Sequence, residues 1–113
     1  MIRTFFYKKK VGQQVYSIEL LTAFTFWQRF LGFMGRAPGR YGMIFNRTNQ
    51  VHMFFMCFSL DVYFLDRNGV VLHVDRALKP WRLSSRVKNA YYVIELPVGH
   101  GVEMEVGDRV EMM

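Results

Sequence analysis

The sequence is poor in cysteine, proline and, over its first half, acidic residues. Its 113 residues include one Cys and three Pro, and Glu19 is the only acidic residue before Asp61. A single cysteine excludes an internal disulfide framework and gives no indication of an oxidising compartment. No repeat, linker or low-complexity segment divides the chain, and its length suits one hydrophobic core. We therefore expect a single domain over residues 1–113.

The chain also lacks an apolar run long enough to form a membrane-spanning helix. The apolar stretch from Met53 to Leu65 is interrupted by Ser59 and Asp61, whereas a spanning helix needs about 20 predominantly apolar residues. The N-terminal segment Met1–Lys10 has charges but no apolar core followed by small residues, so no signal peptide is expected. The sequence predicts a soluble cytoplasmic protein without a transmembrane segment.

Aromatic residues are abundant, with eleven Phe, six Tyr and two Trp. Aromatic and β-branched side chains favour strands, and Asn68-Gly69 between two apolar runs is a strong hairpin signal. The pattern predicts strands over residues 2–7, 13–21, 43–45, 53–65, 70–74, 91–96 and 109–112. The expected fold class is mainly β: a compact antiparallel β-sandwich or barrel.

One or two short helices are expected beside these strands. Thr22 or Thr25 is suited to cap a helix over 26–34, which Gly35 would end. Residues 98–105 are a candidate for one or two further helical turns. Residues 75–89, with Pro80 and many polar side chains, are expected to form an ordered loop.

Charge is distributed unevenly along the chain. Residues 1–60 carry a net charge of +7, and residues 61–113 carry −1. A basic half is compatible with an anionic partner, and equally with a solvated basic face. Because no nucleic-acid-binding motif accompanies it, we do not expect a nucleic-acid partner.

Five segments occur in an order and spacing that resemble a known family. They are Arg29-Phe-Leu-Gly-Phe-Met-Gly-Arg36, Gly42-Met-Ile-Phe45, His52 to Asp66, Val93-Ile-Glu-Leu-Pro-Val-Gly99 and Gly107-Asp108. Over about residues 15 to 112 the chain resembles the small prokaryotic family called domain of unknown function 192. The resemblance implies a small, mainly antiparallel β-fold and no particular activity.

One branch of that family is especially similar, with His-Thr-x-x-Met-Arg-Phe-Pro-Ile-Asp at the centre and Pro-Trp-Arg downstream. The matching segments here are His52–Asp61 and Pro80–Arg82. Among the departures from the pattern, Cys57 stands where a basic residue is common, and Ser59 replaces the proline. If those two residues help to build a site elsewhere in the family, the site is altered in this chain.

Asp61 is the polar group around which a site is expected, because a carboxylate in an apolar stretch needs a cation, N–H donors or solvent. Counting back from the Asn68-Gly69 turn places His73 opposite Tyr63 or Phe64, within diagonal reach of Asp61. The Pro-Trp-Arg loop would then bring Arg82 to Asp61, or bring both to a polar ligand. A purely structural ion pair or a turn-capping Asp is the alternative.

The leading hypothesis is a non-enzymatic binding module for a small polar or anionic ligand or a partner protein. The candidate ligand-binding residues are His52, Asp61, His73, Trp81 and Arg82, with Phe54 and Met56 as an apolar wall. A small enzyme that uses Asp61 and His52 as an acid–base pair is one alternative. A structural or assembly accessory protein with a flat apolar patch is another. We assign no catalytic residue, expect no cofactor and leave the oligomeric state open.

A copper(I) site is a further hypothesis, because His52, Met53, Met56 and Cys57 together offer soft ligands. On one strand, however, these side chains would point to opposite faces in pairs. Met and free Cys are also ordinary core residues. We therefore expect no metal site, and the sequence assigns no role to Cys57.

Overall fold

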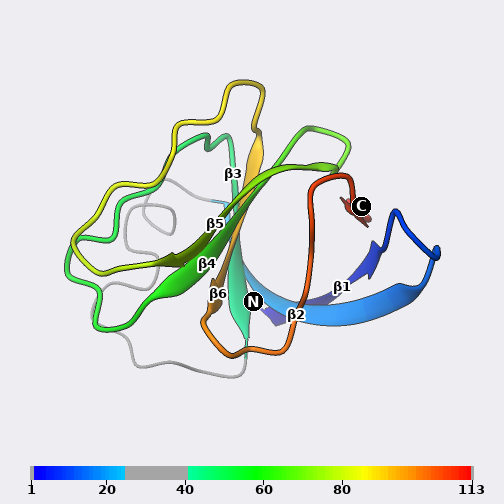
Figure 1. The fold of residues 1–113 in the computed structure, drawn as a ribbon, viewed down its shortest axis with the longest axis horizontal. Coiled ribbons are helices and arrows are strands. Elements are labelled where there is room, and N and C mark those ends of the chain that lie inside the picture. The colour runs from blue at the N-terminus through cyan, green and yellow to red at the C-terminus, as the bar shows by residue number, and fades with distance from the viewer. Residues whose placement is uncertain (1, 25–40, 113) are drawn as a thin grey trace.

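The computed structural model describes residues 2–24 and 41–112. Within these ranges seven strands form one mixed sheet, in the order β5-β4-β6-β3-β2-β1-β7 (Figure 1). Their bounds are β1 Ile2–Lys8, β2 Val15–Ala23, β3 Gly42–Asn46, β4 Leu60–Leu65, β5 Val71–Leu78, β6 Tyr92–Pro97 and β7 Arg109–Val110. The prediction of a mainly β fold is confirmed.

One strand pair departs from the predicted antiparallel pattern. β1 and β2 form the expected antiparallel hairpin, with Ile2 opposite Leu21, but β2 and β3 run parallel, with Leu20 opposite Gly42. A parallel pair needs a crossover connection of about a dozen residues or more. The chain between Ala23 and Gly42 provides that length. The sequence had predicted an antiparallel fold without a crossover connection.

The C-terminal strand joins the two ends of the sheet. β7 pairs with β1 through Tyr7 and Val110, and Val110 N–H also donates to the Gly69 carbonyl at 2.8 Å. Val71 N–H donates to the Asp108 carbonyl at 2.8 Å, next to the start of β5. β7, at one edge of the sheet, is therefore linked by these hydrogen bonds to the start of β5, at the other edge.

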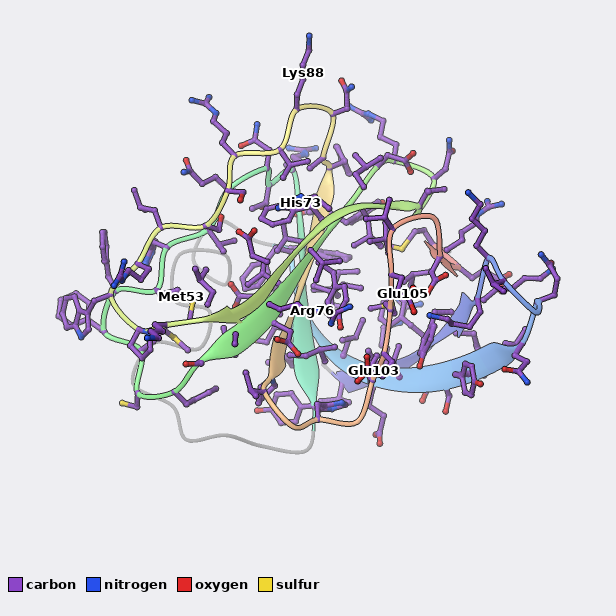
Figure 2. All side chains as sticks on the ribbon, in the orientation of Figure 1. Met53, His73, Arg76, Lys88, Glu103 and Glu105 are labelled. Carbon is purple, nitrogen blue, oxygen red and sulfur yellow. The ribbon has the colours of Figure 1, made fainter. Side chains whose placement is uncertain are left out.

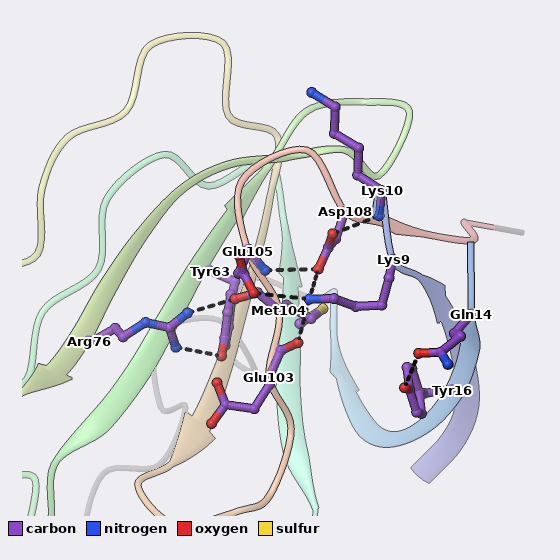
Figure 3. Close-up of polar contacts among 10 residues, drawn as sticks. All are labelled: Lys9, Lys10, Gln14, Tyr16, Tyr63, Arg76, Glu103, Met104, Glu105 and Asp108. Atoms are coloured by element: carbon purple, nitrogen blue, oxygen red, sulfur yellow. Dashed lines mark hydrogen bonds and ion pairs between the residues drawn. The ribbon is translucent and has the colours of Figure 1, made fainter. Parts of the chain in front are cut away.

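A buried carboxylate fixes this closure (Figure 3). Asp108, which is 2% exposed, accepts hydrogen bonds from Lys9 Nζ, from Lys10 N–H at 2.9 Å and from Glu105 N–H at 2.9 Å. Burial acts to raise the pKa of Asp108, but these donors outweigh it and hold the pKa below its usual value. Lys9 on the β1–β2 turn is thereby tied to the segment that precedes β7.

Buried apolar residues form two clusters on opposite sides of the sheet. Along β4, Tyr63 and Leu65 belong to an inner core to which all seven strands contribute, whereas Val62 and Phe64 belong to an outer core. This alternation is the period-2 pattern of a strand that is covered on both faces. Met53, from the segment between β3 and β4, is fully buried in the outer core.

The central apolar stretch is not one long strand. Only its second half forms β4, and residues 51–59 form a loop in which Phe55 has a left-handed backbone (φ +62°). The Met56 N–H donates to the Met53 carbonyl at 3.3 Å and closes a turn there. Apolar content alone was misleading, because this loop is covered on one side only.

Two other predicted boundaries also change. β5 continues to Leu78, because Asp61 and the neighbouring strand β4 give it partners beyond Val74. Residues 98–105 contain no helix, so that prediction is wrong. The predicted helix over 26–34 lies outside the described residues. No helix in the described part of the chain is long and apolar enough to cross a membrane.

Candidate functional site

Two loops that are distant in sequence are joined by backbone hydrogen bonds. The Met53 N–H donates to the Arg82 carbonyl and the Trp81 N–H donates to the Met53 carbonyl, both at 2.7 Å. His52 and Leu83 form an antiparallel bridge between the same loops. Further along, the Ser84 N–H donates to the Val51 carbonyl at 2.9 Å. Residues 51–59 and 79–87 therefore hold each other in place without belonging to the sheet.

Exposed aromatic side chains gather where these loops meet. Phe54, Phe55 and Trp81 are 40%, 59% and 59% exposed, and Leu83 beside them is 58% exposed. The Phe54 ring lies between the His52 ring, stacked at 5.0 Å, and the Trp81 ring at 6.2 Å. Phe55 packs on Trp81 at 4.8 Å. We call these five residues, His52, Phe54, Phe55, Trp81 and Leu83, the aromatic surface.

The backbone of this surface is strained. Phe55 and Trp81 have φ angles of +62° and +67°, in the left-handed region that large side chains rarely occupy. Such conformations persist where surrounding contacts over-determine them, and they cluster at functional sites. Here the hydrogen bond from the Trp81 N–H to the Met53 carbonyl, and that from the Met53 N–H to the Arg82 carbonyl, supply that constraint.

The interior of the two loops anchors the exposed rings. Met53 and Met56 point into the outer core, so the turn between them presents Phe54 and Phe55 outward. Ser84 is 5% exposed, and its backbone carbonyl accepts a hydrogen bond from the Gln50 side-chain amide at 3.1 Å. Figure 2 shows Met53 toward one end of the long axis, opposite the β1–β2 turn of Figure 1. The two loops that carry the aromatic surface therefore lie at the end of the molecule away from the β1–β2 turn.

The charge around the aromatic surface is of one sign. Residues 41–60 and 76–94 contain no acidic residue. The second of these segments carries five exposed cations with no ion pair to any described residue: Arg76, Lys79, Arg82, Arg86 and Lys88. Arg82 follows Trp81 directly in the chain, and Lys79 precedes it by two residues. An anion that approaches the aromatic surface would therefore meet cations and no carboxylate from either loop.

Asp61 has a structural partner. Its Oδ1 accepts the Ala77 N–H at 2.8 Å, where the β4–β5 register shifts and Ala77 adopts a φ of +50°. The Arg76 guanidinium interacts electrostatically with Asp61, but it donates its hydrogen bonds to the Tyr63 hydroxyl and the Met104 carbonyl. Asp61 therefore stabilises a bulge in the sheet edge. No ion pair joins it to Arg82 in the described part of the chain.

His73 lies opposite Phe64, as the turn counting predicted. The sequence predicted that His73 would reach Asp61. The described partner of His73 Nε2 is instead Asp75 Oδ1, at 2.8 Å. Asp75 also accepts the Ser85 N–H and hydroxyl at 2.7 and 2.8 Å. Burial acts to raise the pKa of Asp75, but the Ser85 and His73 hydrogen bonds lower it overall. Asp75 thus ties the second loop to β5.

The predicted acid–base pair is not assembled by a hydrogen bond between its members. His52 Nδ1 accepts a hydrogen bond from the Phe54 N–H at 3.2 Å, and the Asp61 carboxylate accepts one from the Ala77 N–H. No group of three His, Cys, Asp or Glu residues within residues 2–24 and 41–112 is arranged to hold a metal ion. Cys57 is an exposed free thiol. Of the predicted residues, the structure brings together His52, Phe54, Trp81 and Arg82 above Met56, and places Asp61 and His73 on β4 and β5.

Glu95 is a buried carboxyl group that the sequence reasoning did not single out. It is 4% exposed, and across the neighbouring strands it faces Met43 and Val62, both in the outer core. No described residue donates a hydrogen bond to it. Burial raises the pKa of Glu95 to about 8.

Sequence reasoning also missed Phe55, Leu83 and the Asp75–Ser85 contact. The signal for Phe55 was its position beside Phe54, which a single long strand would have buried. Leu83 and Ser85 lie in a segment that was considered only for its charge and its Pro-Trp-Arg motif. An acid-free segment around an exposed Trp was readable from the sequence, but the partner loop was not.

Comparison with known proteins places the chain beside proteins without an assigned function. A family model described as DUF192, "Uncharacterized ACR", matches residues 7–112. A UPF0127 protein of Pyrococcus abyssi is 45% identical over 95 residues, which is 77% of this chain and 80% of that protein. A UPF0127 protein of Thermococcus sibiricus is 36% identical over 110 residues, covering 90% and 71%.

Two crystal structures share the fold. A protein of unknown function from Novosphingobium aromaticivorans superposes with a TM-score of 0.82 at 22% identity, covering 98% of this chain and 85% of that one. A putative transcription regulator from Sinorhizobium meliloti gives a TM-score of 0.79 at 24% identity, covering 96% and 93%. At these identities the likeness establishes the fold alone.

Proposed function

The chain belongs to the DUF192 family of uncharacterised proteins, and from that premise we propose that it is a non-enzymatic binding module whose contact surface is the aromatic surface. The observation that carries the proposal is the mutual packing of exposed Phe54, Phe55 and Trp81 on two loops with left-handed backbone. Contiguous exposed apolar area of this kind marks interaction sites. Backbone strain held at such a surface supports the same interpretation.

The expected partner is anionic. Arg82 and Lys79 flank Trp81, and neither loop contains a carboxylate that would repel an anion. A guanidinium next to exposed rings suits a group that is partly apolar and carries carboxylate, phosphate or sulfonate oxygens. Of the two partners predicted for Arg82, Asp61 and a polar ligand, we therefore assign it the ligand.

The predicted site is accordingly narrowed. His52, Phe54, Trp81 and Arg82 form the contact surface, and Phe55 and Leu83 extend it. Met56 supports it from the outer core. Asp61 and His73 act in the framework, through Ala77 and Asp75.

A fluorescence titration with 8-anilinonaphthalene-1-sulfonate tests the proposal, because this probe combines aromatic rings with an anionic group. We expect saturable binding that Trp81→Ala and Phe55→Ala each weaken roughly tenfold, since each removes most of a ring's buried area. Phe6→Ala is the matched control, because Phe6 is a similarly exposed ring (49%) on β1. Equal affinity of folded Trp81→Ala, Phe55→Ala and unmutated protein would refute the proposal.

A further inference from the structure

We propose that the partner of the aromatic surface is an anionic phospholipid surface, into whose headgroup region Phe54, Phe55 and Trp81 insert. This inference rests on the proposed function and names its partner. It is carried by three features of the described residues: the exposed apolar cluster, the internal hydrogen bonds of its two loops, and the exposed cations close to Trp81 in the chain.

The rings form one exposed apolar cluster. Phe54 packs on His52 at 5.0 Å and on Trp81 at 6.2 Å, and Phe55 packs on Trp81 at 4.8 Å. The three rings are 40–59% exposed, and Leu83, an aliphatic side chain on which no base can stack, is 58% exposed. A cluster of rings with an exposed aliphatic side chain suits entry into an apolar medium.

Part of the backbone of the two loops is hydrogen-bonded within the protein. The N–H groups of Met53, Phe54 and Trp81 donate to the Arg82 carbonyl, to His52 Nδ1 and to the Met53 carbonyl. Unsatisfied polar groups raise the cost of moving irregular backbone toward an apolar phase. These three internal hydrogen bonds lower that cost for the loops.

The cations lie where phospholipid headgroups would be. Lys79 and Arg82 are exposed on either side of Trp81, and Arg86 and Lys88 continue along the same segment. Trp rings concentrate at membrane interfaces, where their apolar body and polar N–H suit the headgroup level. Cations beside such rings attract anionic lipids, and the attraction falls off within a Debye length.

The exposed parts of the three rings amount to roughly 300 Å² of surface, taking about 100 Å² for each half-exposed ring. Insertion of that area is comparable to a single lipid chain, which alone gives weak, reversible attachment. The cations would therefore act as the second signal. The proposal predicts reversible binding that requires anionic lipid, with no stable anchoring to neutral lipid.

Co-sedimentation of the full chain with vesicles tests this. The vesicles are phosphatidylcholine alone, or phosphatidylcholine and phosphatidylglycerol in equal parts. We expect sedimentation with the anionic vesicles that declines as salt is raised, and little with the neutral ones. Trp81→Ala and Phe55→Ala should each lower the partition coefficient about tenfold, and the double change of Lys79 and Arg82 to Gln should lower it at least as much. Phe6→Ala should leave it unchanged.

The lone cysteine gives an independent readout that does not depend on a variant's stability. Cys57 is exposed in the same loop as Phe55. An environment-sensitive fluorophore attached there should shift to the blue with anionic vesicles. The same fluorophore on a Cys57→Ala, Lys10→Cys protein should not shift, because residue 10 lies on the β1–β2 turn.

The outcomes separate the two proposals. If the anionic dye binds in a Trp81-dependent way but neither vesicle is bound, the lipid inference is wrong and the binding surface stands. Trp81-dependent binding of polyuridylate or of an acidic peptide, with no vesicle binding, would also overturn it in favour of those partners. If dye and vesicle binding are both insensitive to Trp81→Ala and Phe55→Ala, both proposals fall.

Discussion

The Met53 carbonyl accepts the Trp81 N–H at 2.7 Å, although the two residues lie on loops that connect different pairs of strands. Met53 is fully buried in the outer core and Trp81 is 59% exposed. The contact therefore links a fixed point of the core to an exposed ring. It turns two irregular segments into one support, on which the aromatic surface depends.

The strain at Phe55 gives a first prediction. At a φ of +62° glycine is favoured over any residue with a Cβ. We expect Phe55→Gly to have a free energy of unfolding roughly 1 kcal/mol higher than Phe55→Ala, because both lose the ring and only glycine relieves the backbone. Urea unfolding of the two variants measures the difference. A less stable glycine variant would show that the backbone there is unstrained in solution.

Asp61 provides a second prediction, which separates framework from site. Asp61→Ala removes the acceptor of the Ala77 N–H, so we expect a loss of about 1 kcal/mol in the free energy of unfolding. Asp61→Asn keeps an acceptor oxygen and should lose less. The affinity for the anionic dye should stay unchanged in both. Weakened dye binding by well-folded Asp61→Ala would return Asp61 to the contact surface.

Glu95 makes stability depend on pH in a defined direction. Its pKa is about 8 in the folded protein, against an ordinary value of 4.5. Between these two pH values the folded state keeps a proton on Glu95 that the unfolded state releases. The contribution of Glu95 to the free energy of unfolding is therefore greatest below pH 4.5 and falls as the pH rises toward 8. Glu95→Gln cannot ionise and does not lose this contribution. Above pH 8 its free energy of unfolding should exceed that of the unmutated protein by about 4 kcal/mol.

Chemical denaturation of both proteins between pH 5 and pH 9, buffered at about constant ionic strength, measures this difference. The gap between the two curves should widen with rising pH and then level off. Parallel curves would mean that Glu95 is ionised throughout and has a partner that stabilises the charge.

Asp108 should act in the opposite direction, because its folded pKa is lowered. Its contribution is complete above the unfolded pKa and is lost as the pH falls through the folded pKa. Asp108→Asn removes the buried negative charge that the Lys9 ammonium contacts, which should cost roughly 2 kcal/mol at neutral pH. The acid sensitivity of the variant should be correspondingly smaller.

Glu105→Gln is the control for that experiment. Glu105 approaches the same Lys9 nitrogen at 3.5 Å, but its side chain is 72% exposed, so the pair should contribute less than about 1 kcal/mol. Thermal and urea unfolding of both variants make the comparison. Equal losses for Asp108→Asn and Glu105→Gln would contradict a closure that depends on Asp108.

The strands were predictable because their signals are local. Alternation located β1 and β2, and Asn68-Gly69 located the β4–β5 turn well enough to place His73 beside Phe64. The parallel β2–β3 pair and the closure through β7 were not predictable in the same way. Both depend on which strands meet in space, and periodicity within a segment carries no information on that.

The candidate site was predictable in part for the same reason. The Pro-Trp-Arg segment and His52 were identified from their residue types, and the structure brings them together. Asp61 was expected to meet a cation, N–H donors or solvent, and the backbone N–H of Ala77 together with partial exposure meets its requirement. Phe55 was missed because a left-handed residue inside an apolar run resembles a strand residue in composition, and only its position beside Phe54 pointed to it.

A chemical-shift titration of the isotopically labelled protein with 8-anilinonaphthalene-1-sulfonate tests the binding surface most directly, because it reports on every backbone amide at once. We expect the largest changes at residues 52–57 and 79–83, with small changes at β1 around Phe6. Changes concentrated on β1, or spread evenly over the sheet, would contradict the assignment of the aromatic surface as the place where this protein meets its partner.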